Sequence, residues 1–505
     1  MIVGAMLMPF WLPASALLTI AGASALFGLA FFLAHREQWR WSILAVALAA
    51  LWIRGYASAD LALHPWDERY HALVAKHLID TPLTPRLYPT PLLSYDHREW
   101  TGNYIWMHKP PLALWLQAAS LKTFGVHELA LRLPSVVISS AAVVLTFYLG
   151  ATLFTPGVGL LAATFQTFNG FLVDLASGRR VSDHVDTFLI FLFELGMLLG
   201  LKWIPRGSTP TGLILGAVCG LAYLTKSLPA LLMLPVWAAM RRQSAPQSSL
   251  WRELGIASAV AAVVAAPWTI YAALAFPIES DYERAEAWRR VTEVLEEHGG
   301  PPWTYVAEMP RFFGELIYVP VAIAIWFVLR GRSSPERRAL LLWAAIPYAV
   351  FSMCATKTPG YVMVAAPALF LVQADVWLWM WQKRQAAPQV TRRILLGALM
   401  FLLAVLPARQ LLEPTGPLEQ RERNPKWARD LRRLTARIGP ENAVLFNVRR
   451  SIEAMFYTPY VAYPHLPSAA QARSLQQRGF KTYVFSDGSA PLSDLPPDVI
   501  VIRPE

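Results

Sequence analysis

Two adjacent carboxylates, Asp67 and Glu68, follow Pro65 and precede a short segment, Tyr70 to Ile79, that is expected to be helical. Because proline interrupts helical hydrogen bonding, Pro65 should end one helix and leave both acids at the start of the next. One acid can then act as a general base or pair with a cation, while the other caps the new helix at its positive end. The alternative interpretation is that both acids only cap that helix.

A histidine and a lysine, His108 and Lys109, stand directly before Pro110 and Pro111 in the same polar stretch. A lysine held in place by two prolines offers a fixed positive charge to a phosphate group. The imidazole of His108 can carry a proton or bind a metal ion. The alternative is that both residues only contact lipid headgroups at a bilayer surface.

The elements that must position these residues are long apolar segments. The chain has 505 residues, of which 55% are hydrophobic and 16% charged, and the charges form short clusters between apolar runs. This composition is typical of membrane proteins. The formal net charge is +11, but the basic residues lie at the ends of apolar segments, where they orient helices and meet anionic lipid. The pattern predicts a membrane protein without a nucleic-acid partner.

The predicted fold class is an all-α polytopic membrane protein with about twelve transmembrane helices and a small C-terminal soluble α/β domain. The helices are expected near residues 8–34, 41–63, 131–152, 157–175, 187–203, 211–225, 227–241, 253–276, 312–329, 339–355, 361–381 and 394–410. No Lys or Arg precedes the first hydrophobic run, which predicts a retained helix rather than a cleaved signal peptide.

The basic clusters fall in alternate short loops, which the positive-inside rule places in the cytoplasm. These clusters are Arg36 and Arg40, Lys202 and Arg206, Arg241 and Arg242, Arg330 to Arg338, and Lys383 to Arg393. The loops near residues 64–130, 179–186, 277–311 and 357 then face outward. Nearly every unusual polar cluster lies in these outward loops, which implies a site assembled from several of them.

The chain changes character after about residue 410, where Pro, Arg and Gln become more frequent and short β-like runs appear at 444–446 and 483–485. This predicts a transmembrane domain over 1–410, with an outer catalytic loop at about 64–130, and a periplasmic α/β domain over 411–505. Cys219 and Cys354 lie in apolar segments, so no disulfide or thiolate metal site is indicated. The sequence has no Gly-rich dinucleotide fingerprint or phosphate loop, so no nucleotide cofactor is expected.

Several of these motifs together resemble a known superfamily. They are Asp67-Glu68, then Lys109-Pro110-Pro111-Leu112 with Trp115, and then Arg132-Leu133-Pro134-Ser135. Their order is similar to that in the lipid-A aminoarabinose transferases and protein O-mannosyltransferases, which have the GT-C glycosyltransferase fold. The resemblance runs from about Ala57 to Leu201 and continues more weakly to about Ala374. It implies an enzyme of the inner membrane that moves a sugar from a polyprenyl-phosphate donor to an outer-face acceptor, such as lipid A or another glycolipid or glycan.

The resemblance also implies roles for individual residues. Asp67 would be the base, Glu68 a second acid, and Asp186, in the family's second acidic loop, would position the sugar or acceptor. The residues implied in substrate or phosphate binding are Lys109, Arg180, Lys357, Tyr361, Tyr70 and Asp183. Helix capping and interfacial anchoring are the alternative roles for the acids near Asp186 and for Lys357.

One residue departs from the family's pattern. In the aminoarabinose transferases the residue before Lys-Pro-Pro is a metal-binding Glu, whereas this chain has His108. Histidine favours zinc and lacks the hard oxygen ligand that magnesium or calcium prefers. Glu286 and His298 are candidates for a second ligand. A divalent metal at His108 is therefore an expectation that the resemblance alone does not decide.

Other functions are compatible with this pattern. A protein O-glycosyltransferase would have the same fold and another acceptor. A membrane lipid or sugar transporter would account for Glu194 and Asp375, two acids inside apolar segments. A transporter, however, should carry its polar residues near the midplane on interrupted helices in repeated halves, whereas here they gather at one surface. A structural scaffold is the remaining alternative.

Overall fold

The computed structural model describes the chain except residues 1–11, 245–248, 414, 440–441, 487–498 and 503–505. The chain forms two compact units. Unit 1 comprises Met1–Ser58, Ser135–Ala275 and Arg284–Arg421, and unit 2 comprises Ala59–Pro134, Phe276–Glu283 and Glu422–Glu505. Each unit therefore collects segments that are far apart in the sequence.

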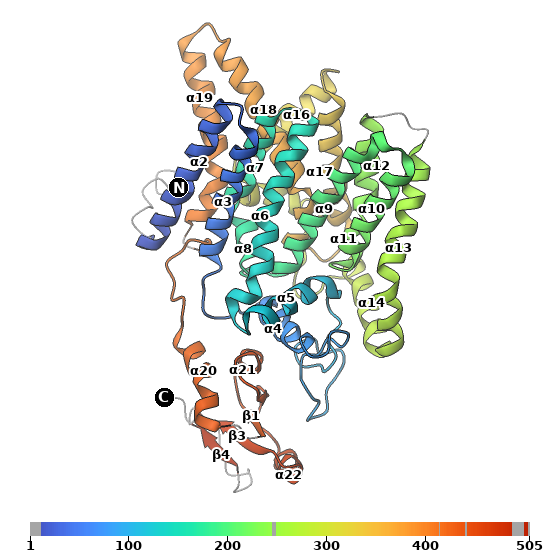
Figure 1. Ribbon diagram of the computed structural model, residues 1–505, viewed down its shortest axis with the longest axis vertical. Coiled ribbons are helices and arrows are strands. Elements are labelled where there is room, and N and C mark those ends of the chain that lie inside the picture. The colour runs from blue at the N-terminus through green and yellow to red at the C-terminus, as the bar shows by residue number, and fades with distance from the viewer. Residues whose placement is uncertain (1–11, 245–248, 414, 440–441, 487–498, 503–505) are drawn as a thin grey trace. The chain divides into compact units, whose positions relative to one another are not determined.

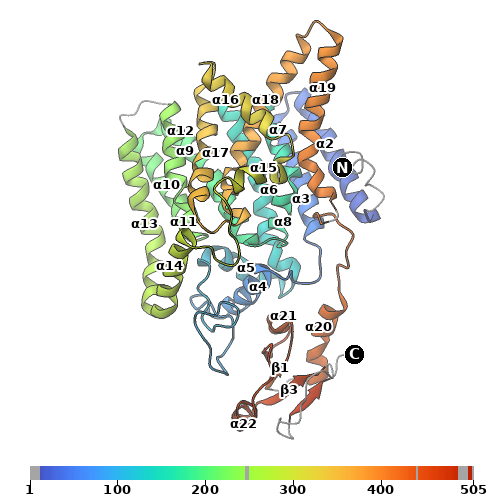
Figure 2. The same cartoon turned by 180° about the vertical axis from the view of Figure 1, so that it is seen from behind.

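Unit 1 consists of helices, which Figures 1 and 2 show from opposite sides. They are α2 (Ala14–His35), α3 (Trp39–Ala57), α6 (Glu128–Leu153), α7 (Pro156–Phe168), α8 (Gly170–Ala176), α9 (Asp183–Trp203), η2 (Ile204–Arg206), α10 (Ser208–Tyr223), α11 (Ser227–Ala230), α12 (Met233–Ser244), α13 (Leu250–Ala275), α15 (Thr304–Phe313), α16 (Tyr318–Leu329), α17 (Pro335–Met353), η4 (Pro359–Ala365), α18 (Ala366–Gln385), α19 (Val390–Val405) and η5 (Leu406–Leu412). Helix α14 (Pro277–Thr292) begins in unit 2 and ends in unit 1, and α6 likewise starts in unit 2.

Several helices are long and apolar enough to cross a membrane, which confirms a helical, polytopic membrane fold. Among the described residues there are six such helices, or up to eight if each of two bent pairs is one span. The bent pairs are α7 with α8, which meet at 62°, and α15 with α16, which meet at 117°. The prediction of about twelve spans is not confirmed.

The breaks have local causes. Asn169 leaves the helical conformation at ψ 110° and its side chain accepts a hydrogen bond from Leu172 N–H, so it ends α7 and caps α8. Gly314 has a φ of 91°, which favours glycine and ends α15. The segment predicted at 211–225 forms α10, whereas the segment predicted at 227–241 forms two shorter helices, the four-residue α11 with Lys226 as its N-cap and then α12.

Unit 2 combines helices with a small parallel sheet. Its elements are α4 (Asp67–Leu78), α5 (Pro111–Phe124), α20 (Lys426–Ile438), β1 (Ala443–Phe446), α21 (Ser451–Tyr457), β2 (Val461–Ala462), α22 (Ala469–Gln477), β3 (Lys481–Phe485) and β4 (Ile500–Ile502). The strand order is β2-β1-β3-β4, and all the pairings are parallel. The β-like runs at 444–446 and 483–485 lie in β1 and β3.

The segment around α4 and α5 shares one hydrophobic core with the sheet. Leu73, Trp106 and Leu131 belong to the same buried cluster as Val444 and Val484. The Lys76 ammonium reinforces this core by donating to the carbonyl oxygens of Met455 (2.6 Å), Phe456 (3.0 Å) and Thr458 (2.8 Å). The sequence predicts two consecutive domains, 1–410 and 411–505, whereas each compact unit contains segments from both ranges.

Candidate functional site

The first acid–lysine pair of the candidate site lies in unit 2. Asp67 is the first residue of α4, and its Oδ2 is 3.6 Å from Lys109 Nζ. Pro110 is the N-cap of α5 and Pro111 its first residue, so the chain entering α5 is stiff where it carries Lys109. The two side chains are 16% and 20% exposed. The structure therefore brings together the predicted base and the predicted phosphate-binding cation in a partly accessible pair.

Glu68, the neighbouring acid, points into the protein and is fully buried. Arg132 donates to both of its oxygens, from Nε at 2.6 Å and Nη2 at 2.8 Å. His64 N–H donates at 2.6 Å as well. Arg132 also donates to the carbonyl oxygens of Asp60 and Ala62, at 2.6 and 2.7 Å. The Glu68 carboxylate thus anchors the turn that precedes α4, an arrangement suited to positioning Asp67 rather than to accepting a proton from substrate.

Tyr70, predicted to bind substrate, is 3% exposed and packs on Trp100 with ring centroids 4.6 Å apart. Its hydroxyl accepts a hydrogen bond from Arg69 at 3.0 Å. Burial raises the pKa of the Tyr70 hydroxyl. Arg69 lies 3.7 Å from Glu453 on α21. These contacts give Tyr70 a packing role, and its binding of substrate stays a prediction.

His108 pairs with a residue that the sequence did not single out. Its Nδ1 lies 2.6 Å from Oε1 of Glu283, which is on the part of α14 that belongs to unit 2. The rings of Trp100 and Trp106 each make an edge-to-face contact with the imidazole, with centroids 5.6 and 5.3 Å away. This pair offers one nitrogen and one oxygen, ligand types that suit zinc. In the described part of the chain, no three His, Cys, Asp or Glu side chains are grouped to hold an ion.

The two ligands suggested by sequence have other contacts. Glu286 lies 2.9 Å from Arg289, one turn further along α14. The backbone carbonyl of His298 accepts a hydrogen bond from Lys357 N–H at 2.7 Å. Glu283, one helical turn before Glu286, was not predicted as the partner of His108, because α14 contains several acids that look equivalent in the sequence.

Unit 1 carries a second acid–lysine pair, in which Asp186 Oδ1 accepts from Lys226 Nζ at 2.5 Å. Asp186 is on the first turn of α9 and is 1% exposed. Lys226 also approaches Ser182 Oγ, at 3.4 Å, and its ammonium lies 4.8 Å from the centroid of the Tyr361 ring. The structure thus joins the predicted residues Asp186 and Tyr361 through a lysine. Lys226 was missed, although a lone cation between two predicted apolar segments was a signal for it.

The backbone of η4 lies in close contact with the Asp186 carboxylate at Gly360. A Cβ added to Gly360 would lie 2.1 Å from Asp186 Oδ2, far inside van der Waals contact. Gly360 follows Pro359, the first residue of η4, so the approach is made by a stiff segment. Only glycine fits here while the carboxylate keeps its place.

The other predicted cations are held by protein groups. Arg180 Nη2 is 2.8 Å from Oδ2 of the buried Asp174, whose Oδ1 is 3.0 Å from Arg179 Nε. Lys357 Nζ donates to the carbonyl oxygens of Ser352 and Cys354 at 3.1 and 2.5 Å. Arg180 keeps a third of its side chain exposed, at 33%, whereas Lys357 is 7% exposed. Arg180 is therefore better placed than Lys357 to meet a ligand.

Asp183, the last predicted residue, is the first residue of α9 and is buried. Its Oδ1 accepts a hydrogen bond from the backbone N–H of His184. The ring of His184 is 2.7 Å from Ser135 Oγ on α6. Asp183 therefore lies in the first turn of α9, where a negative charge is favourable at the positive end of the helix, and its binding of substrate stays a prediction.

Comparisons with known proteins show which chains this one is similar to. A family model described as dolichyl-phosphate-mannose-protein mannosyltransferase matches residues 108–271. The chain is 26% identical over 335 residues to the undecaprenyl phosphate-alpha-4-amino-4-deoxy-L-arabinose arabinosyl transferase of Pseudomonas savastanoi, covering 62% of this chain and 61% of that protein. It is 28% identical to the protein of the same name from Pseudomonas paraeruginosa, covering 61% of this chain and 57% of that one. The alignments thus span about three fifths of these relatives.

Solved structures show the same fold. ArnT from Cupriavidus metallidurans bound to undecaprenyl phosphate has a TM-score of 0.61 and 17% identity, covering 88% of this chain and 90% of that one. The archaeal oligosaccharyltransferase AglB from Archaeoglobus fulgidus has a TM-score of 0.58 and 14% identity, covering 87% and 68%. Together with the family model, these likenesses confirm the predicted resemblance to the GT-C glycosyltransferase superfamily.

Proposed function

We propose that this chain is an inner-membrane glycosyltransferase that moves a sugar from a polyprenyl-phosphate carrier to an acceptor on the outer face. The observation that carries the proposal is the pair formed by Asp67 and Lys109, an acid and a cation 3.6 Å apart at the starts of two helices. The relatives' names support a lipid-phosphate donor, because they specify undecaprenyl phosphate and dolichyl phosphate.

Lys109 stabilises the leaving phosphate. As the bond between the anomeric carbon and the phosphate oxygen breaks, the bonding electrons pass to that oxygen and the carrier phosphate gains a negative charge. A fixed ammonium close to this oxygen stabilises the transition state more than the ground state. The stiffness of Pro110 and Pro111 keeps the ammonium in place, so little reorganisation is needed during the reaction.

Asp67 takes the proton of an acceptor hydroxyl while the hydroxyl oxygen bonds to the anomeric carbon. Direct displacement on the face opposite the phosphate predicts inversion at that carbon. An acceptor that is itself a phosphate is already ionised, and the base then becomes dispensable. The buried contacts of Glu68 with Arg132 hold Asp67 at the start of α4.

The pair of Asp186 and Lys226 is assigned to binding. Its carboxylate is oriented by the Lys226 ammonium and by the close approach of Gly360. A buried, oriented carboxylate suits hydroxyl or amino groups of a sugar, and Arg180 offers a partly exposed guanidinium to an anion. Each residue can be tested by itself, so this assignment stands or fails separately from that of Asp67 and Lys109.

We further propose His108 and Glu283 as protein ligands of a divalent metal ion. Glu283 supplies, 2.6 Å from the His108 ring, the oxygen that a histidine at this position lacks. Bound there, an ion would add positive charge near the leaving phosphate. The zinc content of loaded and desalted protein should fall in Glu283→Ala and stay unchanged in Glu286→Ala, whose side chain pairs with Arg289. Equal zinc content in both variants would refute this ligand assignment.

The acceptor and the C-terminal segment remain part of the proposal. We assign a glycolipid acceptor, such as lipid A, because the relatives named above are aminoarabinose transferases. We also assign the sheet of unit 2 to the periplasm, because the positive-inside rule places the segment around α4 outside. A transporter is less well supported, because both acids that favoured it have partners: Glu194 accepts from Gln166 at 2.7 Å, and Asp375 lies 2.7 Å from Arg337.

Transfer of radiolabelled aminoarabinose from undecaprenyl phosphate to lipid A, by purified protein in nanodiscs, tests the proposal. The Asp67→Asn and Lys109→Met variants should lose transfer. Their matched controls are Asp96→Asn, which alters an exposed acid paired with Arg98, and Lys122→Met on α5. Full transfer by both Asp67→Asn and Lys109→Met, or equal losses in the controls, would overturn the assignment of these residues.

A further inference from the structure

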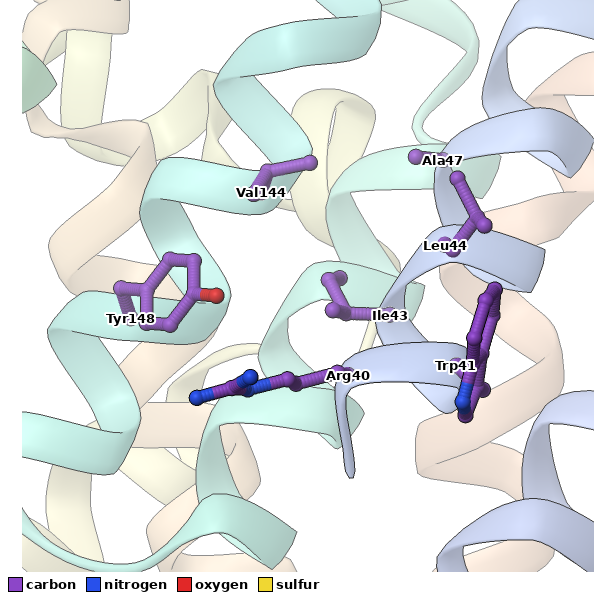
Figure 3. Close-up of a pocket in the computed structure, with 7 residues that line it drawn as sticks. All are labelled: Arg40, Trp41, Ile43, Leu44, Ala47, Val144 and Tyr148. Carbon is purple, nitrogen blue, oxygen red and sulfur yellow. The ribbon is translucent and has the colours of Figure 1, made fainter. Parts of the chain in front are cut away.

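A pocket with no role in the proposed reaction opens between α3 and α6 in unit 1. It has a volume of about 470 Å³ and is lined by Arg40, Trp41, Ile43, Leu44, Ala47, Val144 and Tyr148. Its walls are therefore mainly apolar. Figure 3 shows that the Arg40 guanidinium and the Tyr148 hydroxyl both point into the space between the two helices.

A second cation lies beside the polar end of this pocket. The Lys202 ammonium, near the end of α9, is 4.8 Å from the centroid of the Tyr148 ring. No acidic side chain lines the pocket, and Glu37, the acid of the turn between α2 and α3, is not among the lining residues. Within the described part of the chain, no hydrogen bond or ion pair engages the Arg40 guanidinium. The polar end thus presents positive charge without an internal counter-ion.

The pocket lies at the opposite end of the helices from Asp186. Helices α6 and α9 touch at their starts, where Ser135 contacts His184, and again near their ends, where Tyr148 meets Lys202. At 1.5 Å per residue, the 13 residues from Ser135 to Tyr148 place these two contacts about 20 Å apart along α6. The positive-inside rule assigns the end that carries Arg40 and Lys202 to the cytoplasm.

An apolar surface continues from the pocket along α3. Trp41, Leu44, Leu48 and Trp52 are spaced three or four residues apart and are all exposed. Such a stripe faces the acyl chains when the helix spans a bilayer. The arrangement therefore offers cations and a hydroxyl at the interface, an apolar recess, and then an apolar track towards the membrane centre.

We propose that this pocket binds one anionic diacyl phospholipid from the cytoplasmic leaflet. The phosphate accepts hydrogen bonds from Arg40 and Tyr148 and is further attracted by Lys202, while the acyl chains lie along α3. The site should prefer an anionic lipid to a zwitterionic one, because Arg40 and Lys202 attract a headgroup with a net negative charge more strongly than a neutral headgroup. This site shares no residue with the one proposed for the polyprenyl-phosphate donor.

Native mass spectrometry of the full chain, delipidated and titrated with dioleoyl phosphatidylglycerol or dioleoyl phosphatidylcholine, tests this site. Phosphatidylglycerol should bind more tightly. Arg40→Gln and Lys202→Gln should each weaken its binding about fivefold, which corresponds to about 1 kcal/mol per cation at an anionic surface. Tyr148→Phe should weaken it by a smaller factor.

The matched control is Arg36→Gln. It removes the same charge at the end of α2, four residues before Arg40, but its guanidinium lies over Phe32, at 4.7 Å, and does not line the pocket. Thermal unfolding confirms that each variant is folded, which is expected because Arg36 and Arg40 are both exposed. Equal affinity for the two lipids, unchanged binding by Arg40→Gln, or an equal loss in Arg36→Gln would each overturn the proposal.

Discussion

The contacts of Glu68 predict that replacing Glu68 and replacing its neighbour Asp67 have different effects on the local stability of α4. Glu68→Gln replaces a buried carboxylate that receives two hydrogen bonds from Arg132 and one from His64. It leaves the buried Arg132 guanidinium without its counter-charge, which typically costs about 3–5 kcal/mol. The free energy of local opening at the start of α4 should fall by that amount. Amide hydrogens of residues 67–78 should then exchange at least about 100-fold faster.

Asp67→Asn is the matched control for this experiment, because it changes the adjacent acid. The Asp67 pair with Lys109 is partly exposed, so its loss should cost under about 1 kcal/mol and leave hydrogen exchange of α4 nearly unchanged. Hydrogen–deuterium exchange followed by mass spectrometry of the protein in nanodiscs provides both measurements. The reasoning is refuted if Glu68→Gln leaves α4 protected, or if Asp67→Asn deprotects it as strongly.

Two further predictions concern single positions. Gly360→Ala places a methyl group against Asp186 Oδ2, so the carboxylate must shift from its place beside Lys226, and transfer should fall at least about tenfold. Gly255→Ala, where a Cβ meets nothing within 4 Å, should transfer normally. Normal transfer by Gly360→Ala would contradict the binding role of Asp186. Burial lowers the pKa of His77 from 6.5 to about 4, so between these values the unfolded chain binds a proton that the folded chain does not. The free energy of unfolding should therefore fall by roughly 3 kcal/mol as pH decreases through this window. His77→Asn, which keeps a donor for the Arg86 carbonyl 2.9 Å away, should flatten that dependence in acid-unfolding curves, and an unchanged slope would count against it.

The membrane character could be predicted from the sequence, because the thickness of a bilayer sets the length of the apolar run that spans it. The breaks in those runs could not. Asn169 and Gly314 each interrupt an apolar stretch without the charge cluster that marks a loop. Both breaks produce bent pairs of helices, so hydropathy alone overestimates how many straight helices are present.

The candidate site was predictable where its residues are close in sequence or belong to a shared motif. Asp67 and Lys109 came from such motifs, although their pairing at 3.6 Å was not itself predicted. Lys226 and Glu283 were missed because their partners are 40 and 175 residues away along the chain. Glu68 could not be distinguished from its neighbour Asp67 in the sequence. The two acids differ in the structure because Glu68 is buried against Arg132.

The same principle applies to the core of unit 2. No partner for Lys76 was predicted from the sequence, yet its ammonium donates hydrogen bonds to three carbonyl oxygens around α21. The periodicity of α4 or α21 does not indicate this contact, because the acceptors are backbone carbonyl oxygens at the end of α21, which every residue type carries. Long-range polar contacts of this kind require the structure.

The most direct test of the central claim separates donor binding from transfer in the Asp67 and Lys109 variants. Binding of undecaprenyl phosphate and single-turnover transfer are measured on the same preparations. Loss of a charged hydrogen-bond donor should make Lys109→Met bind the phosphate about 10- to 100-fold more weakly. Asp67→Asn should bind it normally and transfer about 100- to 10,000-fold more slowly to a hydroxyl acceptor. Normal binding by Lys109→Met together with normal transfer by Asp67→Asn would contradict the account.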